Sequence, residues 1–286
     1  MGGGGLGGGG PVNPYASPAG TFGESGGYGG GVGNQPVDFG TVFNHAMKVW
    51  QENLGLLVGT TLVAYIITFG GAFVGEAMKA VVAGAGEPGV TLAVSLLVEL
   101  GKFIFQTYIG IGQVQIALKL GRQQRAEFGD MFGGGSRLGP VIGWMFLVGI
   151  AVYAPLLIVI LIAAGIGVAA GGGGGGGEVI GLSILAFGLL WVVALITAVL
   201  YFWPSYFLVV DGRSSVLESF GKAARISEGN KLNVVVLWFI SVLAMLLGLV
   251  ALCIGVLFAA PLVGLLFAVA YLMMSKQIPA YPNYQR

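Results

Sequence analysis

Six continuously apolar segments dominate this sequence and constrain its fold more than any other feature. They cover residues 53–74, 90–118, 141–169, 179–209, 232–257 and 260–275, and the last is short. A bilayer core of about 30 Å needs about 20 apolar residues per helix, so these lengths are typical of membrane spans. The strands of a transmembrane β-barrel alternate apolar and polar residues, whereas these segments are continuously apolar. The other backbone structure that can span lipid is an α-helix. We therefore expect an all-α integral membrane protein with six transmembrane helices.

The overall composition also favours a lipid environment. Hydrophobic residues make up 56% of the 286-residue chain and charged residues only 9%, with a mean hydropathy of +0.90. So few charges cannot cover a water-soluble globule of this size. The net charge of +1 lacks the excess of Lys and Arg that phosphate backbones require, which argues against nucleic acid as a partner.

Glycine-rich stretches mark one end and one loop of the predicted membrane domain. Residues 1–37 are rich in Gly, Pro, Tyr and Ser, a composition that buries too little apolar surface to fold, so we expect a disordered tail. A six-helix membrane domain is expected over 38–276, followed by a short tail over 277–286. The seven consecutive glycines Gly171 to Gly177 are expected to form a loop outside the hydrocarbon.

The distribution of Lys and Arg predicts the orientation of the chain. Cytoplasmic connections accumulate these residues, whereas translocated connections do not. If the chain crosses the membrane six times, both termini lie on the same side. Most of the 13 basic residues then fall on that side. They are Lys48, Lys119, Arg122, Arg125, Arg137, Arg213, Lys222, Arg225, Lys231, Lys276 and Arg286. The opposite loops contain only Lys79, and Lys102 falls within the second span. Both termini, and the two tails, are therefore assigned to the cytoplasm.

A short pattern recurs ahead of each odd-numbered span. Asp38–Phe43 resembles Glu127–Phe132, and Val216–Phe220 is a weaker third copy at nearly equal spacing. This suggests three repeats, each an interfacial helix followed by a transmembrane hairpin. A basic residue follows each copy at the same distance, and these three residues are predicted to contact lipid headgroups. They are Lys48, Arg137 and Arg225.

The first copy of the pattern has the periodicity of an amphipathic helix. Apolar residues recur at three- and four-residue steps from Phe39 to Trp50, and Lys48 lies between them. Asp38 is a suitable N-cap for this helix. The alternative is an ordinary helix end that continues into the first span.

Four polar residues of the second span fall on one helix face. Glu99, Lys102, Gln106 and Gln113 recur at steps of three, four and seven residues. Ionisable groups inside a bilayer are costly and usually face the bundle interior, so this face is a candidate site. It could be a substrate or ion pathway, or a self-neutralising pair near one interface whose glutamines bond neighbouring helices. A misplaced span boundary is the third interpretation.

No residue pattern predicts catalysis. The chain has one His and one Cys, so neither a metal site nor another cofactor is predicted. His45 falls on the polar side of the first predicted helix and is expected to be solvated or to face headgroups. The sequence contains neither a GxSxG nucleophile motif nor a phosphate-binding loop. We therefore expect no catalytic residues and a protein that is not an enzyme.

Several short stretches share their order with those of a known family. They are Gly112–Lys119, Phe128–Phe132, Pro204–Asp211, Ser219–Arg225, Gly229–Lys231 and Pro261–Tyr271. Together they resemble the YciC-like bacterial polytopic membrane proteins of unknown function, which are related to the membrane portion of some glycerophosphodiester phosphodiesterases. The resemblance implies a six-helix domain in a bacterial cytoplasmic (inner) membrane. It implies no phosphodiesterase activity, because the separate catalytic domain of those enzymes has no counterpart here.

These features predict a non-enzymatic membrane protein that organises or assists other membrane components through its tail and its basic interfacial helices. The expected partners are membrane lipids and other membrane proteins or a second copy of the chain. The main alternative is a small-solute or ion transporter that uses the polar face of the second span. Pro155 and Pro204 could interrupt spans three and four, as in many transporters. A lipid-modifying enzyme ranks third.

Overall fold

Helices account for nearly all of the described chain in the computed structural model, which describes residues 33–84, 87–169, 177–251 and 254–279. Within those residues no β-strand occurs, so the expected all-α fold is confirmed. The elements are α1 (Phe39–Glu52), α2 (Leu54–Gly84), α3 (Pro88–Gly121), the 3₁₀ helix η1 (Phe128–Phe132), α4 (Gly135–Ala169), α5 (Gly177–Phe202), α6 (Pro204–Val210), α7 (Val216–Ser227), α8 (Lys231–Val250) and α9 (Ile254–Met274).

Three sequence-based expectations fall partly or wholly on residues outside this description. They concern the tail at 1–32, glycines 171–176 and the end of the chain at 280–286. Gly177, the last glycine of the run, begins α5.

The long helices have the dimensions of membrane spans. By length and composition, α2, α3, α4, α8 and α9 could each cross a bilayer. The segments Phe187–Phe202 and Pro204–Val210 meet the same criterion together, although the chain bends by 43° between them. The expected six spans are present when this bent pair counts as one.

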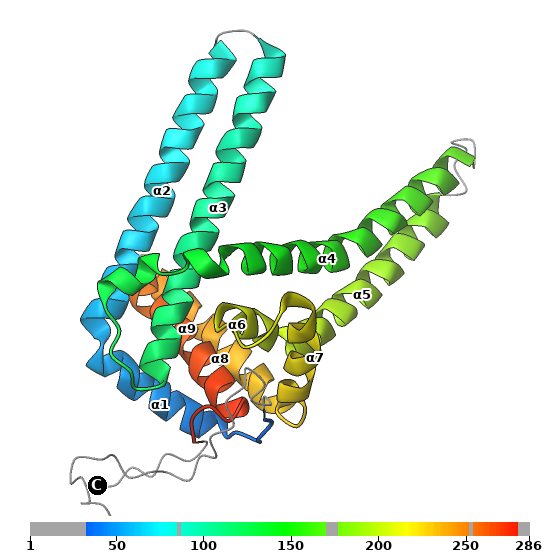
Figure 1. Cartoon of the computed structure of the whole chain (residues 1–286). Coiled ribbons are helices and arrows are strands. Elements are labelled where there is room, and N and C mark those ends of the chain that lie inside the picture. Colours follow the sequence, from blue (N-terminus) through cyan, green and yellow to red (C-terminus); the bar gives the residue numbers. More distant parts are fainter. Residues whose placement is uncertain (1–32, 85–86, 170–176, 252–253, 280–286) are drawn as a thin grey trace, which may run out of the picture. The chain divides into compact units, whose positions relative to one another are not determined.

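The first amphipathic helix begins where the sequence predicts it. The Asp38 side chain accepts a hydrogen bond from the Thr41 backbone N–H at 3.0 Å, so Asp38 is the N-cap of α1. α1 ends at Glu52 and α2 begins at Leu54, and Figure 1 shows them as separate helices. The alternative of one helix continuing into the span is therefore wrong for α1. α7 is likewise separate from the following span, since α8 begins only at Lys231.

The second copy of the repeat does not form an α-helix. Residues Phe128–Phe132 make a 3₁₀ turn, capped by reciprocal bonds between Glu127 and Asp130. Lys119 bonds the Asp130 carboxylate at 2.6 Å and, with the Glu127 backbone N–H, lowers the pKa of Asp130. The interfacial helix expected at this copy is thus present only as a short 3₁₀ helix. Glycines 129, 133 and 134 in a short stretch disfavour an α-helix there.

The expected end of span one is also wrong. α2 continues past residue 74 to Gly84, and Figure 1 shows it beside the antiparallel α3 along the hairpin. Glu76 and Lys79 therefore lie in a helix, whereas the sequence analysis placed Lys79 in a loop. Charged residues in a long helix give no stop signal of their own, and the next strong breakers are the glycines and Pro88 that follow Lys79.

The last two spans divide earlier than expected. α8 ends at Val250 and α9 begins at Ile254, so the predicted boundary between 257 and 260 is wrong and the last span is not short. Pro261, near the start of the expected last span, lies inside α9. The two helices approach each other closely on either side of their connection. A Cβ on Gly248 would lie only 2.9 Å from the Gly255 backbone.

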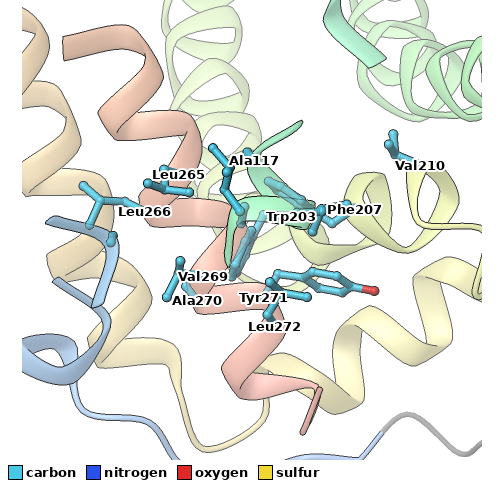
Figure 2. Close-up of a cluster of buried hydrophobic side chains, with 14 of the residues drawn as sticks. Ala117, Trp203, Phe207, Val210, Leu265, Leu266, Val269, Ala270, Tyr271 and Leu272 are labelled. Carbon is cyan, nitrogen blue, oxygen red and sulfur yellow. The ribbon is translucent and has the colours of Figure 1, made fainter. Parts of the chain in front are cut away.

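The C-terminal half of α9 is the centre of the core. Residues from Leu265 to Met274 are almost completely buried, apart from the partly buried Phe267, and α9 packs against α1, α2, α3, α6 and α8. Figure 2 shows Tyr271 of α9 beside Phe207 of α6, and the two rings stack with their centroids 5.5 Å apart. This packing brings the end of α9 next to the ends of α3 and α6.

Candidate functional site

Four charged residues of α2 and α3 form one ion-pair network. Lys79 Nζ lies 2.6 Å from Glu76 Oε1 and 2.9 Å from Glu99 Oε1. Lys102 Nζ lies 3.1 Å from Glu99 Oε1 and 3.5 Å from Glu76 Oε1. Each lysine contacts both glutamates, so the network has no net charge. The pair Glu99–Lys102 considered from the sequence is present, as half of a network that joins two helices.

Sequence reasoning missed the α2 half of this network because it ended span one too early. A signal was available: Glu76 and Lys79 repeat the three-residue spacing of Glu99 and Lys102. Two such pairs on the two arms of an antiparallel hairpin indicate that the arms neutralise each other.

The polar face of α3 does not form one site. At 1.5 Å per residue, the network lies about 30–40 Å from the ends of the helices at Leu54 and Gly121, which is about one bilayer thickness. Gln113 is only about 12 Å from Gly121 and lines a cavity. Gln106, between them, is exposed. A bilayer whose one boundary lies at Leu54 and Gly121 would therefore have its other boundary near the network.

A second polar cluster joins the ends of α3, α6 and α9. One guanidinium nitrogen of Arg122 lies 2.6 Å from both Asp211 carboxylate oxygens and also donates to Gln277 Oε1 at 2.6 Å. Arg213 Nε donates to the same carboxylate at 2.9 Å, and the Tyr271 hydroxyl donates at 3.2 Å. The Asp211 side chain is only 8% exposed. The end of the bundle that holds this cluster also holds α1, η1 and α7. We call it the basic end.

A polar recess of about 450 Å³ lies at the basic end, between α1 and the segment after α3. Its polar lining consists mainly of cationic and amide side chains, together with one carboxylate. The polar lining residues are His45, Lys48, Glu52, Asn53, Gln123, Gln124 and Arg125. Lys48 and Arg125 are both exposed residues, and Arg125 Nε lies 3.6 Å from Glu127 Oε1.

The structure overturns the expectation that His45 is solvated. Its ring is 5% exposed, and Nε2 lies 3.1 Å from the carbonyl oxygen of Gly121. A carbonyl only accepts, so Nε2 carries the proton in this contact. The buried residues of α1 are Val42, His45, Ala46 and Val49, a slightly rotated version of the expected apolar face. His45 therefore joins α1 to the end of α3.

The other two predicted headgroup residues have different surroundings. Arg225 is exposed on α7. Arg137 is half-buried, and its guanidinium occupies the place where a side chain at Gly212 would lie. Gly212 has a φ of +73°, which also favours glycine there. Arg137 thus packs against the loop that carries Asp211.

The described residues contain no group of three His, Cys, Asp or Glu side chains that could hold a metal ion. Comparisons with family models, curated proteins and solved structures gave no match. The all-α, multi-pass class therefore follows from the fold itself, and the resemblance to the YciC-like proteins stays a prediction.

Proposed function

We propose that this chain is a non-enzymatic protein of a bacterial cytoplasmic membrane, of the YciC-like kind, with both termini in the cytoplasm. It organises other membrane components by binding anionic lipid headgroups at its basic end. The observation that supports this most is the recess beside α1, where Lys48 and Arg125 lie with side-chain amides. Charged donors and amides are the groups that bind phosphate oxygens.

The position of the recess supports a lipid as the source of that phosphate. α1 is amphipathic, and the spans α2 and α3 meet the basic end at Leu54 and Gly121. A helix of this kind beside span ends is typical of the headgroup region. On α7, the exposed Arg225 and Leu217 supply a further cation and an apolar side chain that suit the interface.

Removing the two exposed cations of the recess should weaken binding of anionic lipid. Each basic residue near a membrane surface contributes about 1 kcal/mol, so Lys48→Gln with Arg125→Gln should weaken phosphatidylglycerol binding about 30-fold. Native mass spectrometry of the purified protein titrated with this lipid measures the effect. Lys222→Gln, which removes a charge at the basic end outside the recess, is the control. Equal loss in both variants would refute a specific site.

The proposed orientation predicts which loops face the outside of the cell. In a Cys253→Ser background, Glu87→Cys, between α2 and α3, should react with an impermeant thiol reagent in intact cells. Lys222→Cys, on α7, should react only after permeabilisation, because basic segments stay in the cytoplasm. The reverse labelling pattern would contradict the orientation.

A small-solute or ion transporter is the second candidate, favoured by the bend between α5 and α6. Interrupted helices line the substrate sites of many transporters. Two features favour the first proposal over this one. Such sites usually lie near the midplane, whereas Glu99 and Lys102 lie near a boundary, and each already has a partner on α2.

A further inference from the structure

A cavity of about 320 Å³ with several polar side chains in its lining lies between α2, α3, α6 and α9. Its polar lining comprises Thr60, Thr61, Tyr65, Gln113 and Tyr206, and no charged residue lines it. The two threonine hydroxyls donate to carbonyls of their own helix, at 2.9 Å and 2.8 Å. They are therefore already satisfied within the protein.

The other three polar side chains lack such partners. Among the described residues, neither the Gln113 amide nor the hydroxyls of Tyr65 and Tyr206 make a hydrogen bond. Pro261, also in the lining, has no backbone N–H, so the Leu257 carbonyl loses its helical partner. Unmatched polar groups are costly inside a membrane. The cavity therefore suits a molecule that supplies hydrogen-bonding groups without charge.

A second cavity, of about 460 Å³, adjoins the first and is almost entirely apolar. Tyr206, Phe207 and Gly264 line both cavities. Half of its other lining residues are aromatic, namely Trp144, Trp203, Trp238, Phe202, Phe220 and Phe267, and the rest are aliphatic. The indole N–H of Trp144 is bonded to Ser205, whereas that of Trp203, a residue 9% exposed, has no partner among the described residues.

We propose that the two adjoining cavities form one binding site for a neutral amphiphile. Its carbonyl or hydroxyl oxygens bind Gln113, Tyr65 and Tyr206, and its apolar chain lies among the aromatic rings. Volumes of this size are typical of ligand sites. The site is separate from the headgroup recess, since it contains no cation and lies on other residues. An anionic lipid is therefore not its ligand.

The probe for this site is a monoacylglycerol whose chain carries bromine, because bromine close to Trp144, Trp203 and Trp238 quenches their fluorescence. Titration of the detergent-purified protein should give saturable quenching. Unlabelled monoacylglycerol should compete, whereas dodecyl phosphate, which is charged, should not. Quenching that never saturates, or equal competition by dodecyl phosphate, would overturn the proposal.

Two variants test the polar end of the site. Gln113→Leu removes the amide and should weaken binding about tenfold, the usual effect of one lost hydrogen bond to a ligand. Tyr65→Phe, which removes only a hydroxyl, should also weaken it and is the second test if Gln113→Leu does not fold. Gln106→Leu is the matched control, since Gln106 is exposed on the same helix. If neither change weakens binding, the ligand is an acyl chain in the aromatic cavity alone, and the proposal is wrong.

A third variant fills the space that the cavities share. A Cβ on Gly264 would meet no atom within 4 Å, so Gly264→Leu adds bulk to the cavities without a clash at the backbone. It should abolish saturable quenching. Gly101→Leu, an exposed glycine of α3 that also has open space around it, should leave quenching unchanged. Unchanged binding in Gly264→Leu would place the probe elsewhere.

Discussion

Replacing Asp211 with alanine should lower the free energy of unfolding by about 3–5 kcal/mol, because removing one partner of a buried ion pair strands the other charge. The Asp211 carboxylate accepts hydrogen bonds from Arg122, Arg213 and Tyr271. Without it, the Arg122 guanidinium, whose side chain is 19% exposed, keeps Gln277 Oε1 at 2.6 Å as its side-chain partner among the described residues. Titration of the detergent-purified protein with dodecyl sulfate, followed by tryptophan fluorescence, measures the change.

Two further variants show whether this effect comes from the buried network. Asp130→Ala removes a carboxylate from an ion pair with Lys119 whose side chains are more exposed, at 24% and 41%. It should cost less than about 1 kcal/mol. Adding Arg122→Leu to Asp211→Ala should recover part of the loss, since it removes the stranded charge. If Asp211→Ala costs no more than Asp130→Ala, the cluster does not hold α3, α6 and α9 together.

Removing both glutamates of the hairpin network should lower the melting temperature by several degrees and reduce the yield of purified protein. Glu76→Gln with Glu99→Gln leaves the ammonium groups of Lys79 and Lys102 side by side without a carboxylate, among apolar helices. Adding Lys79→Gln and Lys102→Gln should restore most of the stability, because four neutral amides carry no repulsion. Scanning fluorimetry in nanodiscs measures the melting temperatures.

The same variants separate a structural role from transport. Glu218→Gln is the control, because it breaks an exposed pair with Lys222 on α7 and should change the melting temperature little. If Glu99→Gln left stability unchanged but abolished a proton or ion flux into protein-containing vesicles, the transporter would replace the organising protein as the better proposal. A quadruple variant no more stable than the double variant would refute mutual neutralisation.

The helix content and the start of α1 could be predicted from the sequence because local rules control them. Continuous apolar runs predict spans, and Asp38 three residues before the Thr41 N–H is a local capping signal. The pairing of Glu99 with Lys102 is also local, since one helical turn separates them. These features depend on neighbours in the chain.

Other features depend on contacts between distant segments, and there the sequence misled. His45 is polar, yet α1 rests on α3 and gives its ring the Gly121 carbonyl, 76 residues away. The last span was expected to begin at residue 260, but α9 begins at Ile254 and accommodates Pro261 internally. Gln113 was selected as part of a polar face of α3, but its surroundings depend on α2, α6 and α9, and no spacing within α3 reveals a cavity.

The two charge clusters differ in when they become complete during synthesis, because the chain emerges from its N-terminus. All four groups of the hairpin network belong to α2 and α3, so this hairpin neutralises its own charges as soon as it enters the bilayer. Arg122 must wait for Asp211, 89 residues later, and for Gln277 beyond it. The first hairpin can therefore be inserted independently, whereas closure of the basic end is among the last events of biogenesis.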